Sequence, residues 1–132
     1  MLDSKTAIEW IKKHKKVAIV GLSPKDDRPS YHVGQFLMEQ GFEVTPIHPA
    51  HAEILGRPAK ASLAQLAPGE IDWLDLFLNP SRLMDLLPEI TRLKPGMVWC
   101  QLGVVDEEFN RKVEALGVLL VSDRCPKIEW RS

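Results

Sequence analysis

The sequence predicts a single α/β domain in which a doubly wound, mainly parallel five-stranded sheet carries helices on both faces. Five short apolar segments with β-branched or aromatic residues recur along the chain, and amphipathic segments separate them. Strands that are apolar on both faces are typical of a parallel sheet covered by helices, and alternation of strand and helix produces such a sheet. A length of 132 residues fits one compact domain, so we expect residues 1–132 to form one unit.

Each expected strand is a short apolar run. The five runs span residues 17–21, 42–48, 71–78, 97–103 and 118–123. Right-handed crossovers between such strands give a doubly wound sheet, and ligands bind such sheets outside the carboxyl ends of the strands. The search for a site is therefore confined to the segments 21–30, 48–51, 78–80, 101–104 and 123–126.

The helices are expected from apolar residues at spacings of three and four. They span residues 4–14, 31–40, 81–93 and 106–116, with a shorter turn of helix over 62–66. Asp3 or Ser4 can cap the first helix, and Ser81 is the expected cap of the third. Pro88 is an awkward interior residue in that third helix, because proline lacks the N–H group that a helix interior needs.

Charge and composition exclude several classes of protein. The formal net charge is −1, so no general attraction to nucleic acid or to an anionic membrane is expected. No apolar run approaches the ~20 residues of a membrane span, and the first residues do not resemble a secretory signal. Cys100 and Cys125 are too few for a disulfide framework or a zinc site, so we expect reduced thiols in a cytoplasmic protein.

The segment "VAIVGLSPKDDRPSYHVGQFLMEQG" (17–41) has the order strand, loop and helix of a phosphate-binding site, but it lacks the glycine pattern GxGxxG. Gly21 can make the turn after the strand, and the helix that follows presents free N–H groups to an anion. Lys25 and Arg28 add cations, and the hydroxyl groups of Ser23 and Ser30 can donate to phosphate oxygens. The segment therefore predicts a phosphate-binding loop, and either Pro29 or Ser30 could begin its helix.

The end of the second strand bears on which nucleotide binds. An NAD site normally has Asp or Glu at that place, whereas this strand ends in "PIHPAH", and no carboxylate follows until Glu53. NAD is therefore disfavoured, while NADP stays open because Arg57 or Lys60 could meet its extra phosphate. His48 and His51 have no partners at metal-ligand spacing, so no metal site is expected.

No catalytic constellation is evident. Ser23 lacks the GxSxG turn of a hydrolase, and Asp72 and Asp75 lie on opposite faces of one strand, so they do not form a carboxylate pair. Cys125 lies on the ligand side of the last strand, where a thiol nucleophile or a mixed disulfide with a thiol ligand is a subordinate hypothesis. We therefore expect a protein that binds its ligand rather than an enzyme.

The order and spacing of these segments resemble a known family over nearly the whole chain. The segments are "VAIVGLSPKDDRPSYHVGQFLMEQGFEVTPIHP", "ILGRPAKASLAQL", "IDWLDLFLNP", "WCQLGVVDEEF" and "GVLLVSDRCPKIE". The chain resembles the stand-alone CoA-binding proteins, which are similar in fold to the N-terminal CoA-binding domain of the succinyl-CoA synthetase α subunit. The resemblance implies a Rossmann-like fold that holds coenzyme A (CoA) or an acyl-CoA at the carboxyl ends of the strands.

The resemblance also implies a set of contact residues. The residues around the phosphates would be Gly21, Leu22, Ser23, Lys25, Arg28 and Ser30. The nucleotide would be bordered by His48 and Pro49, and the adenosine or pantetheine by Phe77, Leu78 and Asn79. The remaining wall would be lined by Gln101 and Gly103. His48 and Ala61 depart from the asparagine and tyrosine usual in the family, so the resemblance implies the fold but does not fix the ribose and adenine contacts.

The resemblance supplies no reaction, because catalysis by the synthetase depends on other domains. We therefore expect a non-catalytic binding or regulatory module, with a protein partner or a homodimer as open options. An NADP-binding enzyme or a subunit of an oxidoreductase is the alternative.

Overall fold

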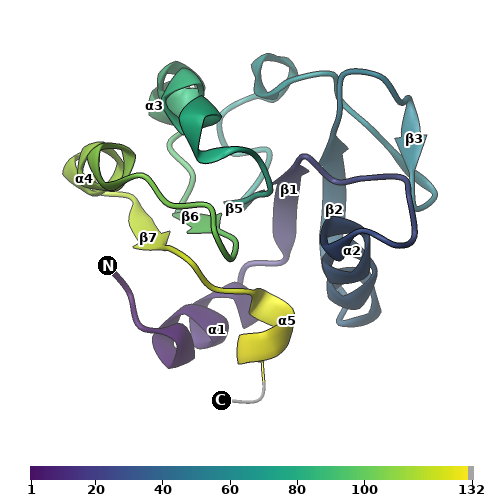
Figure 1. Ribbon diagram of the computed structural model, residues 1–132, viewed down its shortest axis with the longest axis horizontal. Coiled ribbons are helices and arrows are strands. Elements are labelled where there is room, and N and C mark those ends of the chain that lie inside the picture. Colours follow the sequence, from purple (N-terminus) through teal and green to yellow (C-terminus); the bar gives the residue numbers. More distant parts are fainter. Residues whose placement is uncertain (131–132) are drawn as a thin grey trace.

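The computed structural model describes residues 1–130 and confirms the predicted α/β architecture (Figure 1). The main sheet contains β1 (Lys16–Val20), β2 (Glu43–Ile47), β5 (Trp73–Leu76), β6 (Met97–Cys100) and β7 (Leu119–Val121). Its strand order is β2-β1-β5-β6-β7, and every neighbouring pair is parallel. The chain thus runs from β1 to the β2 edge and then crosses back to β5, so the strand order reverses at β1.

The helices cover the two faces of this sheet. On one face lie α1 (Ser4–Lys12), α2 (Pro29–Glu39) and α5 (Pro126–Glu129), and on the other lie α3 (Leu87–Leu93) and α4 (Glu107–Ala115) (Figure 1). Successive strand residues face opposite layers: Trp73 packs in the core beneath α1 and α2, and Leu74 packs in the core beneath α3 and α4. Each fully buried side chain of this size contributes about 1.5–3 kcal/mol, so both faces help to hold the sheet.

The prediction of one helix over 81–93 with Ser81 as its cap was wrong. The structure has a 3₁₀ helix, η2 (Pro80–Leu86), followed by α3, in whose first turn Pro88 lies. Proline is accepted in a first turn but not in a helix interior, which explains why the α-helix begins only at this point. Asn79 caps η2 instead, because its Oδ1 accepts hydrogen bonds from the backbone N–H and the hydroxyl of Ser81 (3.0 and 2.8 Å).

The remaining elements agree with the predictions in kind and differ in length. β1 has its predicted length but lies one residue earlier, and the other four strands of the main sheet are shorter than predicted. Apolar residues beyond the strand ends, such as Ile71, are buried in the adjoining loops. Asp3 is the cap of α1, since its Oδ1 accepts from the N–H of Thr6 at 2.7 Å. A small antiparallel ribbon of β3 (Glu53–Ile54) and β4 (Arg57–Pro58) was not predicted. None of the helices within residues 1–130 combines the length and the apolar character that crossing a membrane requires.

Candidate functional site

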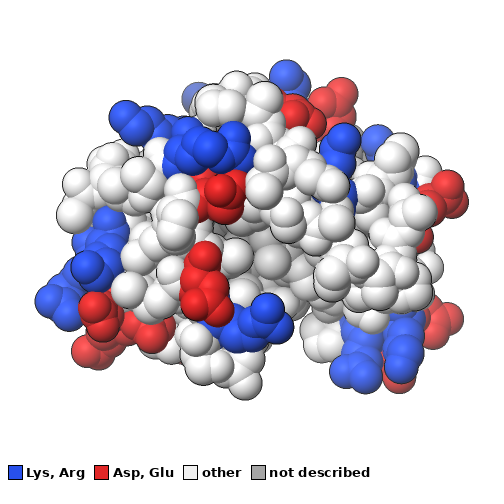
Figure 2. Space-filling model, turned by 90° about the horizontal axis from the view of Figure 1, so that it is seen from above, with Lys and Arg blue, Asp and Glu red and all other residues white. Residues whose placement is uncertain are grey.

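A pocket of about 550 Å³ lies at the carboxyl ends of β1, β2 and β5, where the strand order reverses. We call it the switch-point pocket. Its lining residues are Val20, Gly21, Ser23, Ile47, His48, Pro49, Ala61, Ser62, Leu63, Phe77, Leu78, Asn79, Arg82, Asp85 and Leu86. Figure 2 looks down on the end of the molecule towards which β1 and β2 point, and it shows separate groups of charged residues around a largely uncharged central hollow. The place is the one that the doubly wound topology predicts for a ligand.

Gly21 brings the three strand ends together. Its backbone has φ +82°, and a Cβ atom on it would overlap the carbonyl oxygen of Phe77. The Gly21 N–H donates to the carbonyl of Ile47 at 3.2 Å, and the N–H of Phe77 donates to the carbonyl of Val20 at 2.9 Å. Only glycine allows this turn and this close approach, so the identity of residue 21 fixes the shape of the pocket.

The loop from Gly21 to α2 is held by its own serines. The Oγ of Ser30 accepts from the N–H of Ser23 at 2.9 Å, and the Oγ of Ser23 accepts from the N–H of Lys25 at 3.1 Å. Arg28 occupies the cap position of α2 and Pro29 lies in the first turn, so Pro29 rather than Ser30 begins the helix. The two hydroxyl groups therefore organise the loop, and each still has its own O–H to donate.

The predicted phosphate contacts within this loop differ in accessibility. The side chain of Leu22 is fully buried, so Leu22 offers a ligand only its backbone. The side chains of Lys25 and Arg28 are exposed at the start of α2 and do not line the switch-point pocket. Arg28 Nε lies 3.9 Å from Asp27, an exposed pair that contributes little. Both cations are thus available beside the positive end of an 11-residue helix.

Gly34, in α2, is a site-forming residue that the sequence reasoning missed. A Cβ atom there would lie 3.0 Å from Leu22 Cδ1 and 3.1 Å from Leu55 Cδ1. Glycine therefore lets the helix approach the loop that follows β1, which is the role of the last glycine in GxGxxG. The available signal was a glycine within an otherwise amphipathic helix, 13 residues after Gly21 instead of the usual five.

His48 is held in one orientation at the end of β2. The backbone N–H of His48 donates to the carbonyl of Lys60 (2.9 Å), and the ring Nδ1 of His48 accepts from the backbone N–H of Ala50 (3.0 Å). Burial lowers the pKa of His48, and the nearby His51, whose ring centroid is 4.7 Å away, lowers the pKa further. The ring is therefore neutral at pH 7 with its proton on Nε2, which presents one donor to a ligand.

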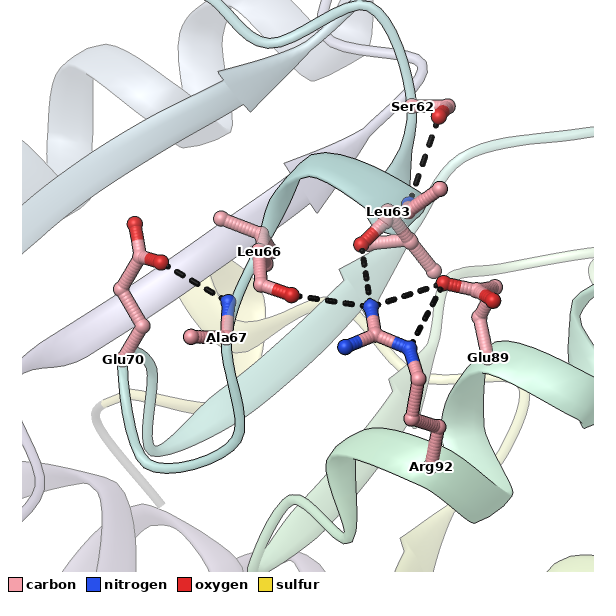
Figure 3. A network of polar contacts seen from close by, with 8 residues as sticks. Ser62, Leu63, Leu66, Ala67, Glu70, Glu89 and Arg92 are labelled. Carbon is pink, nitrogen blue, oxygen red and sulfur yellow. Dashed lines mark hydrogen bonds and ion pairs between the residues drawn. The ribbon is translucent and has the colours of Figure 1, made fainter.

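An arginine on α3 makes a network of polar contacts with the segment that contains the pocket-lining Ser62 and Leu63 (Figure 3). Arg92 Nη2 donates to the carbonyl oxygens of Leu63 and Leu66 at 3.0 and 2.8 Å. The same guanidinium pairs with Glu89, 2.8 Å from Nη2. These bonds hold the short 3₁₀ helix η1 (Leu63–Gln65), and with it the pocket-lining Leu63 and Ser62.

The comparisons with known proteins bear on what this site holds. Residues 15–131 match a family described as a CoA binding domain. This chain belongs to that family. The protein YneT of Bacillus subtilis (strain 168) is 31% identical over 120 residues, covering 91% of this chain and 88% of YneT.

Solved structures of similar proteins have the same fold over nearly the whole chain. The structure of cell-free ID.343 from Thermus thermophilus is 37% identical, with a TM-score of 0.89 and 98% of each chain covered. A hypothetical protein from Pyrococcus horikoshii OT3 is 31% identical, also with a TM-score of 0.89, over 98% of this chain and 91% of that chain. The family and the Rossmann-like fold implied by the sequence are therefore confirmed.

Outside the loop 21–30, two of the residues that the family resemblance implies as contacts do not line the switch-point pocket. Gln101 is buried, and its Nε2 donates to Oδ1 of Asp75 on β5. The N–H of Gly103 donates to Asp123 at 2.8 Å. Oδ2 of Asp75 has no partner among the described residues, and burial raises the pKa of Asp75 to about 7, partly offset by the hydrogen bond from Gln101. The Asp75–Gln101 pair is thus a feature of the core.

Neither cysteine of this family member is a poised nucleophile. Burial raises the pKa of Cys100 to about 12, and burial also raises the pKa of Cys125. Both groups are therefore thiols at neutral pH, whereas the thiolate is the reactive form. Cys125 also does not line the switch-point pocket, and the mixed-disulfide hypothesis stays a prediction. Throughout residues 1–130 no three or more His, Cys, Asp and Glu side chains are grouped as metal ligands would be.

Proposed function

We propose that the protein binds CoA or an acyl-CoA, with the adenosine in the switch-point pocket and the diphosphate on the loop 21–30. One observation carries the proposal: in a chain of the CoA-binding domain family, Gly21 and Ser23 of the loop that leads into α2 line the pocket. Apolar side chains such as Phe77 and Leu78 suit the faces of an adenine ring, while Asn79 and Ser62 offer polar groups at the pocket wall.

The charges near the pocket support CoA over NAD. CoA carries a diphosphate and a 3′-phosphate, and Lys25 and Arg28 stand with the α2 N-terminus where a diphosphate would lie. No carboxylate follows β2 until Glu53, so the acidic ribose contact of an NAD site is missing. The NADP alternative has less support, because neither Arg57 nor Lys60 lines the pocket.

The proposed role is binding or regulation in the cytoplasm, without catalysis by this chain. His48 is fixed as a neutral ring, Asp75 is sealed in the core, and Cys125 is held as a thiol. No nucleophile–base pair is assembled at the pocket from these groups. Free cysteines suit a reducing compartment. A bound acyl-CoA would then be presented to, or sensed by, a protein partner or a second copy of the chain.

Two measurements test the proposal. Mass spectrometry of the natively purified protein should detect CoA or an acyl-CoA that has been retained through purification. Calorimetric titration of the emptied protein should show CoA binding that excludes NADPH. Tighter binding of NADPH, with no competition from CoA, would reject the CoA assignment in favour of the NADP alternative.

A further inference from the structure

We infer that Arg82 is the residue by which the protein distinguishes CoA from dephospho-CoA, because its guanidinium binds the phosphate on the adenosine ribose. The inference rests on the proposed function and adds a specificity-determining residue to it. Arg82 lies in η2, the 3₁₀ helix that follows β5, and not in the phosphate-binding loop.

Arg82 is the one permanently charged cation that the described residues contribute to the pocket lining. His48, which also lines the pocket, is neutral at pH 7 because its pKa is lowered. Lys25 and Arg28 do not line the pocket. An anionic group that enters with the adenosine therefore meets one full positive charge, and that charge is Arg82.

The Arg82 guanidinium is also free to bind. It makes no hydrogen bond or ion pair with any residue in the range 1–130, whereas the guanidinium of Arg92 is occupied by Glu89 and two carbonyl oxygens. The backbone of Arg82 is fixed, since its N–H donates to the carbonyl of Asn79 at 2.9 Å. A planar guanidinium on a fixed turn suits bidentate binding of a phosphate.

The positions of the cations identify which phosphate Arg82 meets. The diphosphate of CoA and its ribose 3′-phosphate are separate anionic groups, and the structure offers two separate sets of cations. Lys25 and Arg28 flank the start of α2, and Arg82 borders the adenosine pocket. The 3′-phosphate is joined directly to the ribose, so it must follow the adenosine into the pocket and towards Arg82.

Asp85 makes the dependence on Arg82 stronger. It lines the same pocket and brings a negative charge to it, without an ion pair to Arg82. With Arg82 present, the phosphate is attracted; with Arg82 removed, the remaining carboxylate repels a phosphate. The loss of Arg82 should therefore reverse or abolish the preference for the phosphorylated ligand.

The test is a calorimetric titration of CoA and of dephospho-CoA, which lacks the 3′-phosphate, against three proteins. These are the wild type, Arg82→Gln and Arg111→Gln. Arg111 is an exposed arginine of α4 that does not line the pocket, so its variant controls for the loss of one positive charge. Thermal unfolding of each variant confirms that it is folded.

We expect the wild type and Arg111→Gln to bind CoA about 10-fold or more tightly than dephospho-CoA, a difference of about 1.4 kcal/mol. Arg82→Gln should bind dephospho-CoA like the wild type but should have lost the preference for CoA. If Arg82→Gln keeps that preference, or weakens both ligands equally, the inference is wrong while the proposed function stands. If the wild type binds CoA and dephospho-CoA equally well, the inference is also wrong. If the wild type binds neither CoA nor dephospho-CoA, the proposed function itself fails.

Discussion

The carbonyl oxygen of Phe77 occupies the space that a side chain on Gly21 would require. The contact joins the end of β5 to the end of β1 and so closes one wall of the switch-point pocket. Because both atoms that would collide are attached to backbone, no rotamer change can relieve the overlap.

Gly21→Ala should therefore destabilise the fold by about 2–5 kcal/mol, combining the cost of a left-handed backbone with that of overpacking. Gly117→Ala is the matched control, since Gly117 has φ +81° but no neighbour within 4 Å of the position that a Cβ atom would take. It should lose only about 1–2 kcal/mol. Urea unfolding of both variants measures the difference, and equal losses would show that the Phe77 contact is unimportant.

Asp75 should make the protein less stable as the pH rises. Its pKa is about 7 in the fold against an ordinary 3.8, so between about pH 4 and pH 7 the unfolded chain has released a proton that the folded chain retains. The free energy of unfolding should then fall by about 1.4 kcal/mol per pH unit in this range and level off above it.

Asp75→Asn removes this titration and keeps an oxygen that can accept from Gln101. The variant should match the wild type near pH 4 and exceed it in stability near pH 8, as measured by urea unfolding across the range. Asp26→Asn, in the exposed loop, is the control and should follow the wild type. A constant difference between Asp75→Asn and the wild type at every pH would contradict the assignment.

Arg92→Ala should weaken both the fold and the ligand site. The change leaves the carbonyl oxygens of Leu63 and Leu66 without their charged donor, which should cost about 1–3 kcal/mol of stability. Since Leu63 lines the pocket and Arg92 does not, CoA affinity should also fall without any lost contact to the ligand. Arg111→Ala provides the comparison; a loss of stability with unchanged affinity would mean that η1 does not shape the site.

Arg28→Ala should weaken CoA binding by about 1.5–3 kcal/mol, the range for hydrogen bonds to charged groups. The effect should be the same for CoA and for dephospho-CoA, because both carry the diphosphate. Its exposed side chain makes only a long contact to Asp27, so the stability of the unliganded protein should hardly change. Calorimetry that finds unchanged affinity would remove Arg28 from the proposed phosphate site.

The sequence predicted most of the fold because its strands are apolar on both faces and its helices have clear periodicity. It also pointed to the strand ends that form the pocket, since parallel strands bring Gly21, His48 and Asn79 to one edge. The helix around Pro88 was harder to predict, because helix propensity alone does not say whether a proline bends a helix or begins a new one.

The residues that sequence reasoning missed depend on contacts distant along the chain. Gly34 matters because Leu22 and Leu55 pack against it, and Arg92 matters because its guanidinium reaches Leu63, 29 residues away. Arg82 belongs to the same class, since a single arginine in a short helix has no pattern that reveals the cavity beside it. Gln101 is a contact that the family resemblance implies, and no pattern in the sequence indicated that its side-chain amide bonds to buried Asp75.

The division of the core into two layers has a consequence for optical experiments. Trp73 and Trp99 are buried on the α1–α2–α5 face, and Trp10 and Trp130 pack against the same cluster; the sequence contains four tryptophans in all. The opposite layer and the switch-point pocket contain none among the residues described. Intrinsic tryptophan fluorescence will therefore report on the packing of the α1–α2–α5 face. Within residues 1–130, no tryptophan lies in the opposite layer or lines the pocket to report on the packing there or on a bound adenine ring.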